Sequence, residues 1–180
     1  MNNKIIKLKL TVAHAKCEKC GMERILHFTS SYTYGERVVS TVSGKKCAYV
    51  NLLDENVMQE LEEQCMNVFQ ERGVEISQNK LARIVPYLYG VTCDDINGEK
   101  VDTISALKCP CCLGKMVEDD KYGEKVEEID AFMVTHSMWA RLSREEKRKE
   151  VVGELIRQGY LSWDKSHNFN YGYTLGLQYP

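Results

Sequence analysis

The sequence predicts an α+β fold in which an antiparallel sheet carries two main helices. Three observations lead to this prediction. Segments near the N-terminus alternate apolar and polar residues with the period of two that a half-buried strand requires. Two later segments place apolar residues at helical spacing behind N-terminal capping residues. Two short cysteine pairs, at 17–20 and 109–112, have the spacing of metal-binding turns.

The size and composition indicate one globular domain. The chain has 180 residues, of which 43% are apolar and 28% are charged, as is usual for a soluble protein. We therefore treat residues 1–180 as a single domain with its own core. No segment approaches the ~18 apolar residues of a membrane span, and Met1–Val12 interleaves lysines with apolar residues, unlike a signal peptide. We expect a cytoplasmic protein whose eight cysteines serve metal binding more than disulfides.

Four strands are predicted in the first third of the chain. Residues 6–12 alternate apolar side chains with Lys and Thr, and segments 24–34, 37–42 and 47–53 are rich in β-branched and aromatic residues. Glycine-containing turns separate the later segments. We expect these strands to form an antiparallel meander.

The two helices are defined by their ends. Asp54 caps a helix that stops at Gly73, and its apolar face includes Cys65, which we expect to be a small buried hydrophobe. Ser143 and Glu146 form a capping box for a second helix that stops at Gly159. Other segments give weaker signals. They predict a short strand at 74–76, an apolar run at 81–88 interrupted by Pro86, and a strand at 101–107. An exposed acidic loop is predicted at 118–128, followed by a buried strand at 129–139. A hairpin of 160–163 with 171–177 would complete a C-terminal strand–helix–hairpin unit over 129–180.

The cysteine pairs carry the clearest chemical signal. They read Cys17-Glu18-Lys19-Cys20-Gly21 and Cys109-Pro110-Cys111-Cys112-Leu113-Gly114, and together they offer the four thiolates of a closed tetrahedral zinc site. Both resemble the knuckles of zinc-ribbon proteins, which carry C-x-x-C-G and C-P-x-C-x-G. The resemblance implies one structural zinc ion (Zn) bound by Cys17, Cys20, Cys109 and Cys112. Cys111 then occupies the variable position and should point away.

The distance between the pairs departs from that family. Paired knuckles usually lie about 15 to 20 residues apart, whereas the strand–helix segment 21–108 separates them here. Either this segment is a large insertion in a zinc ribbon, or each pair finds other partners. The alternative ligands are Cys47, Cys93, His14 and His27.

The signals for catalysis are weaker than those for metal binding. None of the four histidines lies in an H-E-x-x-H motif, and there is no G-x-S-x-G elbow. A redox-active C-x-x-C motif should lie at the start of a helix, but Leu113–Met116, which follows the second cysteine pair, does not predict a helix. A metal-containing hydrolase or nuclease whose site is assembled only in three dimensions, using His136 or His167, stays as the alternative. A winged helix is a further alternative for the C-terminal part, although it needs two more helices upstream.

Charge is distributed unevenly along the chain. Residues 1–46 hold nine Lys/Arg and three Asp/Glu, a net charge of +6, whereas residues 118–130 have a net charge of −5. The simplest explanation of this asymmetry is that each charged segment forms a solvent-exposed face. The basic segment could also contact nucleic acid, and its candidate contacts are Lys16, Lys19 and Arg24, near Tyr32 and Tyr34. We predict a non-enzymatic, zinc-stabilised binding or adaptor protein that acts on a protein or a protein–nucleic-acid assembly.

Overall fold

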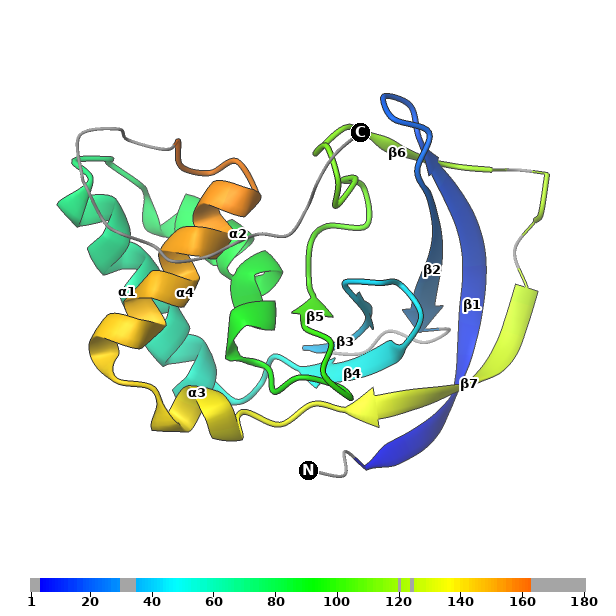
Figure 1. Cartoon of the computed structure of the whole chain (residues 1–180), viewed down its shortest axis with the longest axis horizontal. Helices are drawn as coiled ribbons and strands as arrows, with labels where there is room; N and C mark the ends of the chain where they lie inside the picture. Colours follow the sequence, from blue (N-terminus) through cyan, green and yellow to red (C-terminus); the bar gives the residue numbers. More distant parts are fainter. Residues whose placement is uncertain (1–3, 30–34, 120, 124, 163–180) are drawn as a thin grey trace.

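The computed structural model describes residues 4–29, 35–119, 121–123 and 125–162. Within these residues a seven-stranded, mostly antiparallel sheet occupies one side of the molecule and helices occupy the other (Figure 1), which confirms the α+β prediction. The elements in chain order are β1 (Ile5–Cys17), β2 (Glu23–Thr29), β3 (Glu36–Thr41), β4 (Cys47–Asn51), α1 (Glu55–Glu71), α2 (Gln78–Leu88), the 3-10 helix η1 (Tyr89–Thr92), β5 (Val101–Asp102), β6 (Met116–Glu118), β7 (Lys125–Met133), α3 (Ser137–Arg141) and α4 (Arg144–Arg157).

The sheet order corrects the predicted meander. The strands lie in the order β2-β1-β7-β4-β3-β5, and β6 pairs with the end of β1. Strands β1 and β2 form one antiparallel pair and β3 and β4 another, as expected. However, β7 lies between the two pairs and runs parallel to β4. The meander prediction was wrong because no local signal shows which distant strand will separate two hairpins.

The position of β7 also accounts for the uneven charge of the chain. Residues 5–12 of the basic β1 pair with residues 132–125 of the acidic β7. The Nζ atom of Lys7 lies 3.1 Å from a carboxylate oxygen of Glu128 and 3.6 Å from one of Asp130. Each exposed pair contributes only about 0–1 kcal/mol, but opposite charges across a ladder favour this register. The pairing of β1 with β7 therefore neutralises part of the charge asymmetry, at Lys7.

Both predicted helices are present with their predicted ends. The Asp54 side chain accepts a hydrogen bond from the backbone of Val57, and Gly73 follows α1 with φ of +63°. The capping box at the start of α4 is formed in both directions, and Gly159 follows that helix with φ of +74°. Cys65 is fully buried in α1, as predicted.

Helix α2 was missed because of Pro86. The Ser77 side chain caps this helix, and its buried residues have helical spacing: Leu81, Ile84, Val85 and Leu88. Pro86 removes one backbone donor within the helix, but burial of this apolar face offsets the loss. Residues 74–76, predicted as a strand, lie outside the strands and lead into the cap of α2.

Two other predicted strands are shorter than expected. The segment 101–107 contains only the two residues of β5, and the segment 129–139 leaves the sheet after Met133 and then enters α3. The carboxylate of Asp94 accepts hydrogen bonds from the backbone of Ser137 and Met138, so it caps α3 from a distant part of the chain. The loop predicted at 118–128 is partly wrong, because Glu118 ends β6 and residues 125–128 belong to β7. Of the predicted C-terminal hairpin, residues 160–162 form no strand, and residues 163–180 lie outside the described residues.

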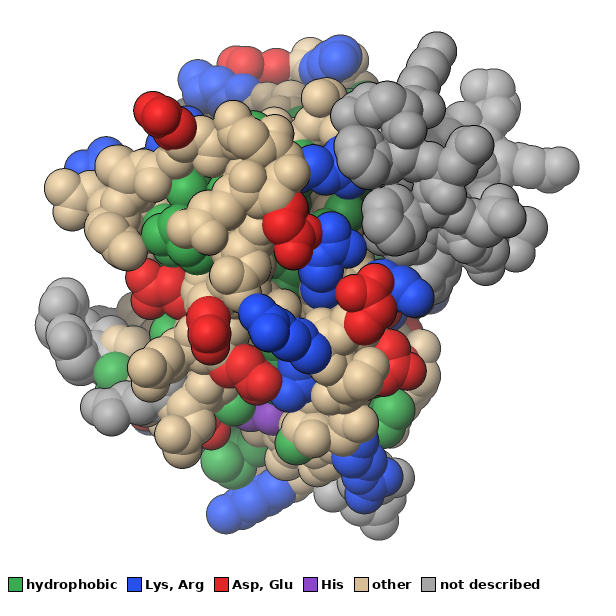
Figure 2. Space-filling view, turned by 90° about the vertical axis from the view of Figure 1, so that its left-hand side faces the viewer, with side chains coloured by type: hydrophobic (Ala, Val, Ile, Leu, Met, Phe, Trp, Pro, Cys, Tyr) green, Lys and Arg blue, Asp and Glu red, His purple; other side chains and the backbone are tan. Residues whose placement is uncertain are grey.

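The main core lies between the helices and the β4–β3–β5 end of the sheet. It contains Ala48 and Val50 of β4, Leu61 and Val68 of α1, and Val151 of α4, among others. The outer face of the helical side carries acidic and basic side chains side by side (Figure 2). Beneath the surface, the buried Lys147 pairs with Glu60 at 2.6 Å. Among the described residues, no helix is both long enough and apolar enough to cross a bilayer.

Candidate metal centre

The first knuckle, residues 17–21, turns the chain from β1 into β2. The backbone N–H of Cys17 donates to the carbonyl of Met22 at 2.9 Å, and the N–H of Gly21 donates to the carbonyl of Cys17 at 3.0 Å. Gly21 has φ of +73°, a conformation that glycine adopts without steric cost. This closed turn places Cys17 and Cys20 on the same side of the loop.

The second knuckle, residues 109–114, has a matching internal pair of bonds. The N–H of Cys109 donates to the carbonyl of Gly114 at 2.8 Å, and the N–H of Leu113 donates to the carbonyl of Cys109 at 2.9 Å. A bridge between Lys108 and Lys115 closes the base of the loop. The turn therefore holds Cys109 and Cys112 within a rigid frame.

A short ladder joins the two knuckles although 88 residues, 21–108, separate them in the chain. Strand β6, which follows the second knuckle, pairs with the end of β1 so that Met116 lies opposite Cys17. The N–H of Glu18 also donates to the carbonyl of Lys115 at 3.0 Å. The segment between the knuckles can thus form its own strands and helices without separating the cysteines.

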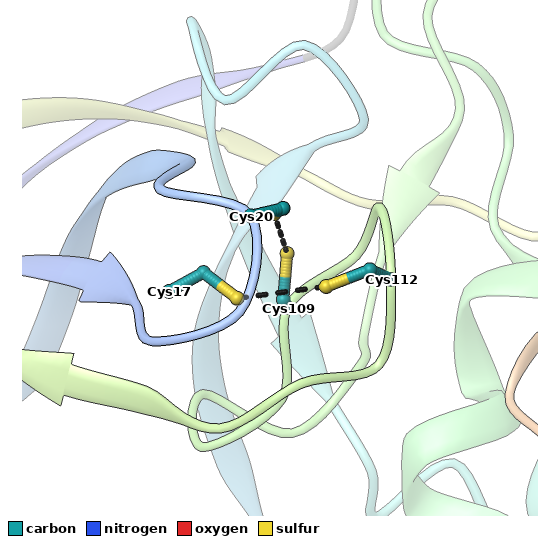
Figure 3. Close-up of side chains that lie close together, drawn as sticks. All are labelled: Cys17, Cys20, Cys109 and Cys112. Carbon is teal, nitrogen blue, oxygen red and sulfur yellow. Dashed lines mark hydrogen bonds between the residues drawn. The ribbon is translucent and has the colours of Figure 1, made fainter. Parts of the chain in front are cut away.

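The four cysteines converge into one group, which we call the cysteine cluster (Figure 3). All four Sγ atoms lie within 4.8 Å of one another; the Cys17–Cys112 distance is 3.5 Å and the Cys20–Cys109 distance is 3.6 Å. These separations are far longer than the ~2.05 Å of a disulfide bond. Tetrahedral zinc with Zn–S bonds of 2.3 Å requires about 3.8 Å between sulfur atoms. The spacing therefore fits a four-thiolate metal centre.

Gly114 provides the space in which the sulfur atoms meet. A Cβ atom at this position would lie 3.1 Å from the Sγ of Cys17 and 3.2 Å from the Sγ of Cys112. It would also lie 2.9 Å from the Cβ of Lys19. The glycine that closes the knuckle motif is thus needed for close approach, because any side chain would push the sulfur atoms apart.

Hydrogen bonds and burial act in opposite directions on the thiol groups of the cluster. Hydrogen bonds from the backbone N–H groups of Cys20 and Lys19 lower the pKa of the Cys17 thiol to about 6, against the effect of burial. The N–H of Gly114 also favours a thiolate at Cys112, but burial and nearby sulfur atoms raise the pKa of Cys112 above its usual value. Four thiolates repel one another unless a divalent cation neutralises them.

The other candidate ligands lie outside this cluster. Cys47 is buried in the sheet, the Sγ of Cys93 donates to the carbonyl of Tyr89, and His14 stacks on Tyr122 at 4.3 Å. His27 is half-buried on β2, and burial lowers its pKa. Cys111 is exposed and does not belong to the cluster.

The three candidate nucleic-acid contacts have different environments. Lys19 is exposed, and Lys16 is exposed with its Nζ atom 3.9 Å from Glu23. The Arg24 side chain is only 8% exposed and lies 3.9 Å from the buried Asp102. Arg24 therefore does not offer its guanidinium to a phosphate at the surface, because it spans the seam between β2 and β5.

His136, the residue considered for a hydrolytic site, is held by structural contacts. Its Nδ1 atom lies 2.9 Å from the carbonyl oxygen of Thr92, and its Nε2 atom lies 3.3 Å from the hydroxyl of Tyr89. Tyr89 is fully buried, and burial raises the pKa of its hydroxyl. These contacts connect η1 to the segment before α3. His167, the other candidate, lies outside the described residues.

Sequence reasoning overlooked Met22, which directly follows the first knuckle. Its Sδ atom lies 3.7 Å from the Sγ of Cys109 and 3.3 Å from the Sγ of Cys111. A methionine beside a C-x-x-C-G motif was the available signal, but ordinary core packing explains such a residue equally well.

Comparisons with known protein families, with curated proteins and with solved structures give no match.

Proposed function

We propose that this protein is a non-enzymatic, zinc-stabilised binding or adaptor protein of the cytoplasm. The closed arrangement of four sulfur atoms carries this proposal. A site with four thiolate ligands leaves no coordination position for water or substrate, so its zinc acts structurally. Zinc would be bound by Cys17, Cys20, Cys109 and Cys112 and would link the end of β1 to the loop before β6.

A cavity beside the knuckles gives no support to small-molecule catalysis. It has a volume of about 210 Å³ and is bordered by the start of β2, by the turn at 41–44, by Asp102 and by Pro110. Sites for small molecules usually have volumes of about 300–1,000 Å³. This cavity is smaller, and the histidine considered for hydrolysis, His136, contacts a different part of the fold.

A protein partner is favoured over a nucleic acid by the surface near the second knuckle. Leu107 is 71% exposed, and Leu113 within the knuckle is also exposed. Exposed apolar side chains on a rigid loop suit contact with a protein surface. The basic side chains nearby are partly neutralised, since Lys16 faces Glu23 and Lys115 faces Glu18 at 4.0 Å.

The proposal is tested by metal analysis and by affinity capture. Freshly purified, reduced protein should contain one zinc ion per chain. Proteins captured from lysate by the purified chain should stay bound after treatment with RNase and DNase. Leu107→Asp should reduce the amount of captured protein. The matched control is Val126→Asp, because Val126 is 66% exposed on β7. Protein without zinc would refute the metal centre, and capture that is abolished by nucleases or equally weakened by both variants would refute the docking role.

A further inference from the structure

Cys111 has an unusual neighbour for an exposed cysteine. It projects from the second knuckle outside the cysteine cluster, and its Sγ atom lies 3.3 Å from the Sδ atom of Met22. The same Sδ atom lies 3.7 Å from the Sγ atom of Cys109. These separations are close to the 3.5 and 3.6 Å between sulfur atoms within the cluster. Three sulfur atoms from three different residues thus meet at the rim of the knuckles.

Backbone hydrogen bonds of the two knuckles hold the chain positions that carry this second group of sulfur atoms. The carbonyl of Met22 accepts the N–H of Cys17, and the second knuckle that carries Cys111 is closed between Cys109 and Gly114. Met22 is half-buried and packs against the small core beside the knuckles, whereas Cys111 is open to solvent. The group therefore has one accessible side through which an ion can enter.

We propose that Cys111, Met22 and Cys109 form a second metal site, which binds one soft monovalent cation of the Cu(I) class. Thiolate and thioether sulfur are the ligands that such ions prefer, whereas protein zinc sites use Cys, His, Asp and Glu. Cys111 gives up its thiol proton to solvent as its sulfur binds the ion, and Met22 contributes a neutral sulfur. Cys109 would be a ligand in both sites, and this inference rests on the proposed zinc centre only through that shared residue.

The test uses Ag(I) as a redox-inert probe for a Cu(I) site. Zinc content is first measured on the purified full-length protein, and Ag(I) is then added stepwise while native mass spectrometry counts both metals. We expect wild-type protein to take up one Ag(I) ion before any zinc is released. Cys111→Ser and Met22→Leu should each weaken binding of this first ion by about tenfold or more, since even indirect changes at metal sites have effects of that size.

Two controls separate this site from the zinc centre and from general sulfur chemistry. Met138→Leu changes an exposed methionine on α3 and should leave Ag(I) binding unchanged. Met22→Leu preserves side-chain volume, so it should keep the zinc and the fold.

Release of zinc by the first Ag(I) ion in wild-type protein would overturn the second site. Unchanged Ag(I) binding in both Cys111→Ser and Met22→Leu would also overturn it. Purified protein that lacks zinc would instead refute the proposed zinc centre, and the effect of Cys111→Ser and Met22→Leu on Ag(I) binding would then still decide the second site.

Discussion

The helical side and the knuckle side of the molecule are stabilised in different ways. The helical core contains seventeen buried residues among those described, drawn from α1, α2, α4 and the sheet. The core beside the knuckles contains five, and two of these are Cys17 and Cys109 of the cysteine cluster. A large apolar core is sufficient to hold helices together, whereas a core of five residues needs an additional cross-link. Zinc would provide that cross-link on the knuckle side.

A buried ionic group connects the two sides. Asp102 of β5 is 2% exposed and lies 3.0 Å from Arg157 of α4 and 3.9 Å from Arg24 of β2. The Nη1 atom of Arg24 has no hydrogen-bond partner within the described residues. Arg24 therefore depends on Asp102 for the neutralisation of its charge. Substitutions on the helical side, on the knuckle side and at Asp102 should therefore have different effects on zinc binding and on the free energy of unfolding.

The largest effect is expected from removal of a proposed zinc ligand. Cys17→Ser or Cys109→Ser should abolish zinc binding, which can contribute about 10 kcal/mol or more to folding. Because the core beside the knuckles is small and the helical core is large, we expect the knuckles and β6 to lose protection in hydrogen exchange while the core amides of α1 and α4 retain more of it. Elemental analysis measures the zinc. Cys65→Ser, in the helical core, should retain the zinc. Loss of zinc from Cys65→Ser but not from Cys17→Ser or Cys109→Ser would place the metal elsewhere.

The next largest effect is expected at the connection between the sides. Asp102→Asn removes the charge that faces Arg24 and Arg157 and should reduce the free energy of unfolding by about 3 kcal/mol, as does the loss of one partner from a buried pair. Denaturant titration measures the change. Asp130→Asn is the control, because its ion pair with Lys7 is exposed and should contribute less than about 1 kcal/mol. Equal effects of the two variants would contradict the role of Asp102.

A comparable but purely local effect is expected in the helical core. Leu61 of α1 is fully buried, and Leu61→Ala should lower the free energy of unfolding by about 2–5 kcal/mol. Zinc stoichiometry should stay at one, since the cysteine cluster has its own core. Leu107→Ala, at an exposed position, should change stability little. Loss of zinc from folded Leu61→Ala protein would show that the two sides are not stabilised separately.

The smallest effect is expected at Gly114. A methyl group there would press on the sulfur atoms of Cys17 and Cys112, so Gly114→Ala should weaken zinc binding by about 10–100-fold. Competition with a zinc chelator measures this affinity. Gly153→Ala is a suitable control, because Gly153 lies within α4 and nothing lies within 4 Å of a Cβ atom there. Unchanged zinc affinity in Gly114→Ala protein would show that the knuckles are less tightly packed than the structure indicates.

The sequence alone was sufficient for features that depend on neighbouring residues. The caps of α1 and α4, the first strand and the two knuckle turns are all specified by side chains within a few positions of one another. The helical spacing of the buried residues of α2 also indicates a helix, but Pro86 within the segment obscures this signal. In each of these cases a local hydrogen bond or a local apolar face determines the backbone.

Only the tertiary structure decided the features that depend on distant pairing. Strand β7 lies between the β1–β2 and β3–β4 pairs, where its register with β1 joins a basic segment to an acidic one more than a hundred residues away. The pairing of β6 with β1 brings the knuckles together and leaves Cys112 inside the cluster and Cys111 outside it. Arg24 is buried because β5 places Asp102 beside it. No residue near any of these positions in the sequence specifies its partner, since contact is made only after the long intervening segments have folded.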